Sequence, residues 1–233
     1  MPRKPERDHP EAKEPSPREA IIAAFMALLG EKRIEEIGFA EIARRAGLNL
    51  ALCRTEFGDV LAILAAHAKE VDRQVLAGGE AEMAEEPPRE RLFDVMMRRL
   101  DALAPHKPAL RSLLRSVRSN PPLACALNLM TVRSMQWMLT AADIDAAGPR
   151  GMLRAQGLAL LHASMLRTFV VDDDPGLART LAALDRGLAR GAQWAGMLDD
   201  LLRLSPSRLC RRRRVPERSP TGNGAAGDAP AAA

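Results

Sequence analysis

The sequence predicts an all-α protein of about nine helices, and three observations lead to that fold class. Apolar residues make up 47% of the 233 residues, whereas aromatic residues make up only 3% and tyrosine is absent. The apolar residues are mostly Ala, Leu, Ile and Met, most of which favour helices, and long runs rich in Val, Tyr and Thr are missing. Apolar residues also recur at helical spacing between breaks that contain Pro or Gly.

Four regions follow from the composition along the chain. Residues 1–16 are polar and rich in Pro, and residues 205–233 are rich in Pro, Gly, Ala and Arg, so both are expected to be disordered. Between them, a Gly-Gly, acidic and Pro-Pro stretch at 78–88 predicts a linker. This linker separates a small helical domain at 17–77 from a larger helical domain at 88–204.

Proline and apolar spacing locate most of the helices. The first is expected from Pro17, a favoured first-turn residue, to about Gly30, with an apolar face of Ile22, Phe25, Met26 and Leu29. Later helices are expected at about 59–77, 88–104, 106–118, 121–144, 149–171 and 175–203. For the last of these, Asp174 is the expected cap and Pro175 the first helical residue.

Two short helices lie between the first and the fourth. One begins near Phe39 and ends at Gly47, because glycine readily adopts the left-handed conformation that stops a helix. The other covers 50–56, with Asn49 as a good N-cap, and Phe57 follows it. Two short helices joined by a tight turn, inside a small bundle, form a helix-turn-helix.

A helix-turn-helix suggests which side chains reach DNA. Leu48 and Leu52 are expected to anchor the third helix to the bundle, so that its other side can enter the major groove. Asn49 and Thr55 would contact phosphate or a base edge, and Arg54 would contact guanine or phosphate. The predicted DNA-facing set is Arg44, Asn49, Leu50, Ala51, Arg54 and Thr55.

The stretch REAIIAAFMALLGEKRIEEIGFAEIARRAGLNLALCRTEF resembles the N-terminal module of the TetR family of transcriptional regulators. The matching features are the apolar first helix, FAEIARRAG, the turn residue Asn49 and the closing Phe57. The resemblance implies a DNA-binding head, joined by the fourth helix to a helical body. In that family the body usually binds a small ligand and dimerises through its last two helices. We therefore expect a dimeric DNA-binding regulator, most simply a repressor, that responds to a small apolar ligand.

The head departs from the family pattern in its charge. Arg54 stands where the family usually has an aromatic residue, and Val60 stands where it usually has a phosphate-binding lysine. Residues 16–60 contain six cationic and seven anionic side chains, a net charge of −1. Since phosphate neutralisation supplies most non-specific affinity for DNA, these departures weaken the prediction of DNA binding. A plain helical bundle with a coincidental turn is the alternative.

The body also faintly resembles the ubiquinone-biosynthesis accessory proteins, which share the TetR fold and bind lipid without recognising DNA. This second resemblance rests on Trp137, the Ala-Ala-Asp step at 141–143 and the three aspartates at 172–174. It implies an alternative function, a lipid- or isoprenoid-binding accessory protein without DNA binding.

Methionines are frequent in the body. Their flexible thioethers together suit an adaptable apolar pocket, although ordinary core packing explains any single one of them better. The predicted pocket residues are Met97, Met130, Met135, Met138, His162 and Met165.

The last helix combines an apolar stripe with small residues at every fourth position. Glycine inside a helix destabilises it by roughly 1 kcal/mol relative to alanine, so close approach of another helix would explain its presence. That helix belongs either to the same chain or to a second subunit, and the family resemblance favours a two-fold dimer. The predicted interface residues are Leu181, Leu184, Gly187, Leu188, Gly191 and Ala195.

Other function classes find no support in the sequence. The histidines lack metal-ligand spacing, and there is no phosphate-binding loop or nucleophile motif, so neither an enzyme nor a cofactor or metal site is predicted. Three separated cysteines, Cys53, Cys125 and Cys210, argue against disulfides and fit a reducing cytoplasm. Neither a signal peptide nor a membrane span is expected. The net charge of +4 is concentrated in the run 211–214, which is expected to be a solvated tail.

Overall fold

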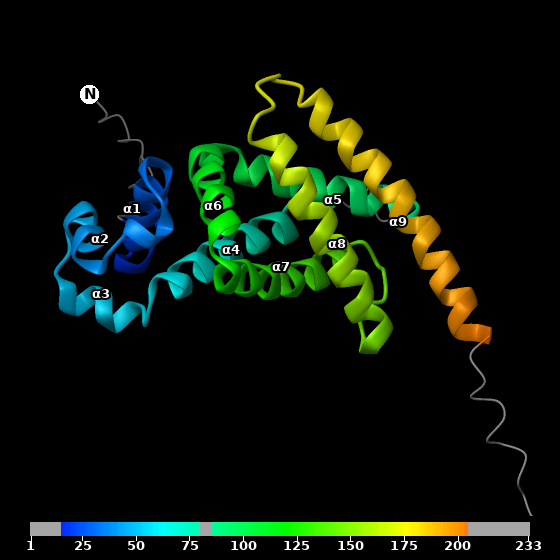
Figure 1. Ribbon diagram of the computed structural model, residues 1–233, viewed down its shortest axis with the longest axis horizontal. Coiled ribbons are helices and arrows are strands. Elements are labelled where there is room, and N and C mark those ends of the chain that lie inside the picture. Colours follow the sequence, from blue (N-terminus) through cyan, green and yellow to red (C-terminus); the bar gives the residue numbers. More distant parts are fainter. Residues whose placement is uncertain (1–14, 80–84, 205–233) are drawn as a thin grey trace, which may run out of the picture. The chain divides into compact units, whose positions relative to one another are not determined.

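The computed structural model describes residues 15–79 and 85–204, and side chains as far as Gly191. All regular structure in these residues is helical, as predicted (Figure 1). The described residues up to Trp194 form one compact unit, and the continuation of the last helix from Ala195 belongs to a second unit.

Four short elements form the N-terminal head. They are α1 (Pro17–Glu31), the 3-10 helix η1 (Ile34–Glu36), α2 (Phe39–Ala46) and α3 (Leu50–Glu56). Ser16 and Glu19 form a capping box that satisfies backbone N–H groups at the start of α1. The turn between α2 and α3 has the predicted form, because Gly47 is left-handed with φ 68°. Asn49 caps α3, its Oδ1 accepting from the backbone N–H of Leu52 at 2.7 Å.

The remaining helices follow in chain order. They are α4 (Val60–Ala77), α5 (Pro88–Leu103), the 3-10 helix η3 (Ala104–His106), α6 (Lys107–Ser119), α7 (Pro121–Ala141), α8 (Gly148–Phe169) and α9 (Ala178–Leu204). Proline stands in the first turn of α5, α6, α7 and α8, where its missing N–H leaves no helical hydrogen bond unmade.

Two helix ends differ from the prediction by several residues. Helix α7 stops at Ala141 rather than 144, since Asp143 is left-handed with φ 57°. Helix α9 starts at Ala178 rather than 175, because Leu177 is also left-handed, with φ 49°. Asp174 does accept from the N–H of Ala178 at 3.2 Å. The buried Asp172 accepts the backbone N–H of Thr180 in the first turn of the helix, so the two carboxylates share the cap.

Two hydrophobic cores hold the described residues together. The first lies in the head and includes Phe25, Ile42 and Cys53, but Ala109 of α6 and Leu123 of α7 also belong to it. The second core draws its residues from α4, α5, the later part of α7, α8 and the start of α9, with Leu110 of α6. The boundary expected at 78–88 remains a prediction, and the head core draws residues from both sides of it.

Helix α6 is bound directly to the end of α1. The buried Ser112 donates its hydroxyl to the backbone carbonyl of Lys32 at 2.6 Å. Arg33 donates to Oγ of Ser119 at 2.7 Å. A Cβ on Gly30 would lie 3.4 Å from Cβ of Pro108, at ordinary van der Waals distance, so the end of α1 lies directly against the start of α6. These contacts fix the head against α6.

Candidate nucleic-acid interface

Helix α3 presents one side to the head core and the other to solvent. Cys53 is fully buried and Phe57 nearly so, whereas Leu50 is 53% exposed. Leu48 packs against the core while half-buried, and Leu52 is half-buried. The main anchors of α3 are therefore Cys53 and Phe57. The sequence had predicted that Leu48 and Leu52 would take this role.

All six residues of the predicted DNA-facing set are exposed: Arg44, Asn49, Leu50, Ala51, Arg54 and Thr55. Since a helix has 3.6 residues per turn, the four members on α3 occupy one side of it. Some of their polar atoms are already engaged. Oδ1 of Asn49 caps α3, and Oγ1 of Thr55 donates to the carbonyl of Ala51 at 3.0 Å. The amide N–H groups of Asn49 remain as donors.

Ion pairs within the head neutralise three of its six cationic side chains. Lys32 pairs with Glu41, and Arg45 forms a bidentate pair with Glu31 at 2.8 and 2.9 Å. This hydrogen bonding lowers the pKa of Glu31 below its ordinary value, so the carboxylate stays ionised.

Arg18 is also paired, with Glu56 at 3.6 Å. Two arginines of the predicted set are less engaged. Arg44 is 82% exposed and lies 4.0 Å from its nearest carboxylate oxygen, on Glu41. Arg54 donates to the carbonyl of Gly58 at 3.5 Å and has no ion pair among the described residues. The cationic groups best placed for phosphate are therefore these two.

The predicted apolar pocket residues separate into two groups. Met135, Met138, Met165 and His162 are buried in the second core or against it, and Met97 is partly buried there. Met130 instead packs against the head core. The six side chains are therefore divided between two cores.

A buried polar cluster, which sequence reasoning missed apart from His162, crosses the second core. The carboxylate of Asp72 on α4 pairs with Arg99 on α5, and its other oxygen accepts from Ser134 on α7 at 2.7 Å. The charge of Arg99 acts on His67 of α4 and on His162 of α8. The available signal was an arginine at a position where helix spacing predicts a core residue, between Met96 and Leu103.

The histidines of this cluster are neutral. Burial lowers the pKa of His67 to about 4, with the neighbouring His106 and Arg99 adding to the shift. Burial lowers the pKa of His162 to about 3, again with Arg99 contributing. The rings of His67 and His106 meet edge to face, with centroids 4.6 Å apart.

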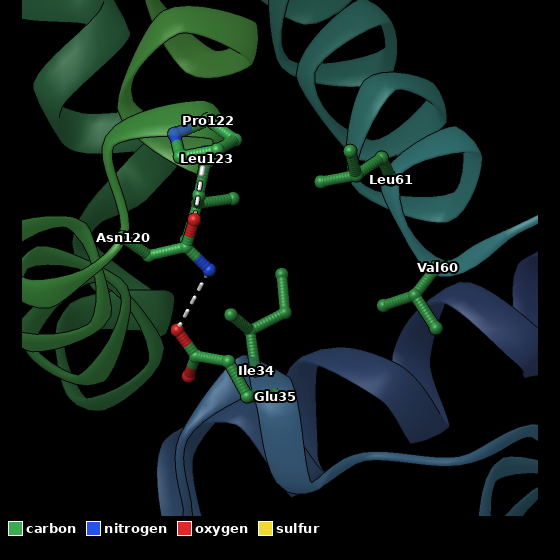
Figure 2. A pocket seen from close by; sticks show the side chains of 7 residues that line it. All are labelled: Ile34, Glu35, Val60, Leu61, Asn120, Pro122 and Leu123. Carbon is green, nitrogen blue, oxygen red and sulfur yellow. Dashed lines mark hydrogen bonds between the residues drawn. The ribbon is translucent and has the colours of Figure 1, made fainter.

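A shallow pocket of about 290 Å³ lies apart from the polar cluster, beside η1 and the start of α4 (Figure 2). Its lining is mostly apolar: Ile34, Glu35, Val60, Leu61, Asn120, Pro122 and Leu123. Nδ2 of Asn120 donates to the carboxylate of Glu35 at 3.3 Å, joining η1 to the start of α7.

The predicted interface residues of α9 are partly used within the chain. Leu184 and Leu188 are buried in the second core, and Leu181 is half-buried. A Cβ on Gly187 would lie 2.1 Å from Cδ1 of Leu161, so this glycine accommodates α8 of the same chain. Gly191 is exposed, and the side chain of Ala195 lies outside the described residues.

Two negative findings apply to the part of the chain that the structure describes. It holds no cluster of three or more His, Cys, Asp or Glu side chains that could bind a metal ion. None of its helices is long and apolar enough to cross a membrane. Of the cysteines within it, Cys53 is buried, Cys125 is exposed and both are free.

A three-helix head with a protruding third helix, followed by a larger set of helices, defines a helix-turn-helix protein with a helical body. The solved structures show which fold this is. A TetR transcriptional regulator from Nitrosomonas europaea matches with a TM-score of 0.60 and 21% identity, covering 76% of this chain and 98% of its own. A TetR regulator from Rhodococcus sp. RHA1 matches with a TM-score of 0.53 and 18% identity, covering 75% and 95%.

A tetR-family regulator from Streptomyces coelicolor matches with a TM-score of 0.50 and 18% identity, covering 81% of this chain and all of its own. The chain therefore has the fold of TetR-family regulators, as the sequence predicted. No family model matches the sequence, and no curated protein matches it either.

Proposed function

We propose that the protein is a DNA-binding transcriptional regulator. The observation that carries the proposal is the solvent-exposed side of α3, which includes Arg54 and Thr55, together with the exposed cap residue Asn49 and the exposed Arg44 of α2. A short helix braced by a second one is the arrangement that enters the major groove. The TetR fold of the chain supports the same function.

Repression, dimerisation and response to a small apolar ligand complete the proposal. Two subunits would place two copies of α3 about one turn of DNA apart. A candidate dimer surface is the exposed side of α8 together with α9, since Leu153 and Leu160 are 48% and 60% exposed there. A ligand that binds one arrangement of the helical body better than another would shift the equilibrium between them and thereby change DNA affinity.

The alternative is a lipid- or isoprenoid-binding accessory protein of the same fold that does not bind DNA. The internal pairing of Arg18, Lys32 and Arg45 favours it, because paired cations release few counterions from DNA.

A gel shift with DNA from beside the protein's own gene separates the two functions. A regulator shifts this DNA at about 50 mM salt, where phosphate contacts are strongest, and absence of a shift would argue for the accessory protein. Arg54→Ala should weaken binding by roughly 1–3 kcal/mol. Arg73→Ala on α4, an exposed arginine paired with Glu70, is the matched control and should leave affinity unchanged. Equal affinities for the two variants would remove Arg54 from the interface.

A further inference from the structure

The polar cluster of the second core contains several atoms that lack hydrogen-bond partners. They are Nδ1 of His162, Nε2 of His67 and Nε of Arg99. All three side chains are more than nine-tenths buried, at 3%, 8% and 5% exposure. Buried polar atoms are nearly always hydrogen-bonded in native proteins, so three unpartnered atoms in one cluster indicate that another molecule completes it.

The cluster is electrically balanced as it stands. The guanidinium of Arg99 is neutralised by the carboxylate of Asp72, which also accepts from Ser134. Both imidazoles are neutral, as described above. A charged group added at this depth would lack a counter-ion, and burial of an unpaired charge is strongly unfavourable.

The hydrogen-bonding chemistry defines the group that fits. Nε of Arg99 can only donate, and a neutral imidazole nitrogen can donate or accept according to its tautomer. The complementary group is therefore an uncharged oxygen that accepts hydrogen bonds, such as a carbonyl.

The surroundings of the cluster are apolar and rich in methionine. Met96 precedes Arg99 by three residues on α5, and Met165 follows His162 by three on α8, so each lies one helical turn away. Met138 follows Ser134 by four residues on α7. All three methionines are buried, and their flexible side chains can rearrange around a bound apolar chain.

We propose that the buried cluster of His67, Arg99 and His162 is a binding site for an apolar molecule with an uncharged carbonyl oxygen. The oxygen accepts from Nε of Arg99 and from an imidazole nitrogen, while the apolar chain lies against the methionines. This inference rests on the proposed function in that it names the chemistry of the ligand that the helical body recognises.

Titration calorimetry on the full chain tests the chemistry with probes that differ only in their polar group. The probes are 2-nonanone, nonanoate and nonylammonium, with 2-heptanone and 2-undecanone covering shorter and longer chains. We expect at least one ketone to bind about tenfold more tightly than the charged probes, a difference of about 1.4 kcal/mol. Equal binding of nonanoate, or no binding of any ketone up to its solubility limit, would overturn the proposal.

Substitution of His162 tests the site itself. His162→Phe keeps a planar ring but removes the unpartnered Nδ1, so the ligand-free protein should be at least as stable while ketone affinity falls about tenfold. His162→Asn, which restores a polar group near that position, should recover most of the affinity. If the His162→Phe protein does not fold, His162→Leu serves as the test in its place. Arg167→Ala, at an exposed position of α8, is the control.

The outcomes separate this site from the proposed function. Unchanged ketone affinity in His162→Phe would refute the site whatever the DNA result. A DNA shift without ketone binding leaves the regulator in place and removes only the ligand. Ketone binding without a DNA shift keeps the site and favours the accessory protein.

Discussion

The buried histidines predict a loss of stability in mild acid that can be calculated from their environment. Unfolding exposes both imidazoles to water, where their pKa returns to about 6.5. In the folded chain the pKa of His67 is about 4 and that of His162 about 3. Below about pH 6.5 the unfolded chain therefore binds two protons that the folded chain does not bind, so the free energy of unfolding decreases as the pH falls.

The magnitude follows from the width of this interval. A solution at about pH 5 lies about 1.5 pH units below the pKa of the imidazoles in the unfolded chain, and each pH unit corresponds to about 1.4 kcal/mol of free energy. Each histidine then lowers the free energy of unfolding by about 2 kcal/mol relative to about pH 7.5. The sum of about 4 kcal/mol is a large part of the 5–15 kcal/mol typical of a folded domain. Carboxylates whose pKa is lowered, such as Glu31 and Glu70, lose their stabilising effect mainly below this interval.

Urea unfolding followed by far-UV circular dichroism at the two pH values measures the effect. His162→Phe removes one of the two titrating groups, so its free energy of unfolding should change by only about 2 kcal/mol over the same interval. A wild-type change below about 1 kcal/mol would show that the two imidazoles are hydrated or already protonated in the folded chain, and would refute the argument.

Three further predictions concern DNA contacts, packing and a helix cap. If Arg44 and Arg54 are the cations that contact phosphate in each head of a dimer, a plot of log Kd for DNA against log salt concentration should have a slope of about 3.6. A slope above about 7 in this salt titration would contradict the internal pairing of the other cations. Gly151→Ala should destabilise the fold by about 1–3 kcal/mol in urea unfolding, because its Cβ would lie 2.0 Å from the carbonyl carbon of Ala146. Gly30→Ala, with only ordinary contacts, should raise stability by about 0.5 kcal/mol and is the matched comparison. Asp172→Ala should lower the midpoint of urea unfolding by an amount equivalent to about 1–3 kcal/mol, because Thr180 loses the acceptor for both its backbone N–H and its hydroxyl.

Local sequence signals were sufficient for most of the fold. Gly47 and Asn49 determine the turn and the start of α3 through backbone conformation and capping, which depend on neighbouring residues only. The exposed positions of α3 followed from the same helical spacing. The predicted start of α9 was wrong because Asp174 and Pro175 form a turn that ends at a left-handed Leu177. This backbone conformation has no clear signal in the sequence.

Features that depend on packing between distant segments could not be predicted. The pairing of Arg99 with Asp72 joins residues 27 positions apart, and neither side chain carries a local sign of its partner. The ion pairs of the head could not be predicted either, because the net charge does not show which arginines are paired with a carboxylate. Gly187 was correctly associated with a close helix contact, but only the structure identifies Leu161 of the same chain as one such contact.

The contribution of α6 and α7 to the head core has a consequence for cooperative unfolding. A fragment ending at residue 77 would lack Ala109 and Leu123 and would leave the backbone carbonyl of Lys32 without the hydroxyl of Ser112. Amide hydrogens of α1 and α6 should therefore exchange with solvent at similar, slow rates, as one unit. The smallest piece in which the head is stably folded would then extend beyond Leu123, well past the linker that the sequence suggests.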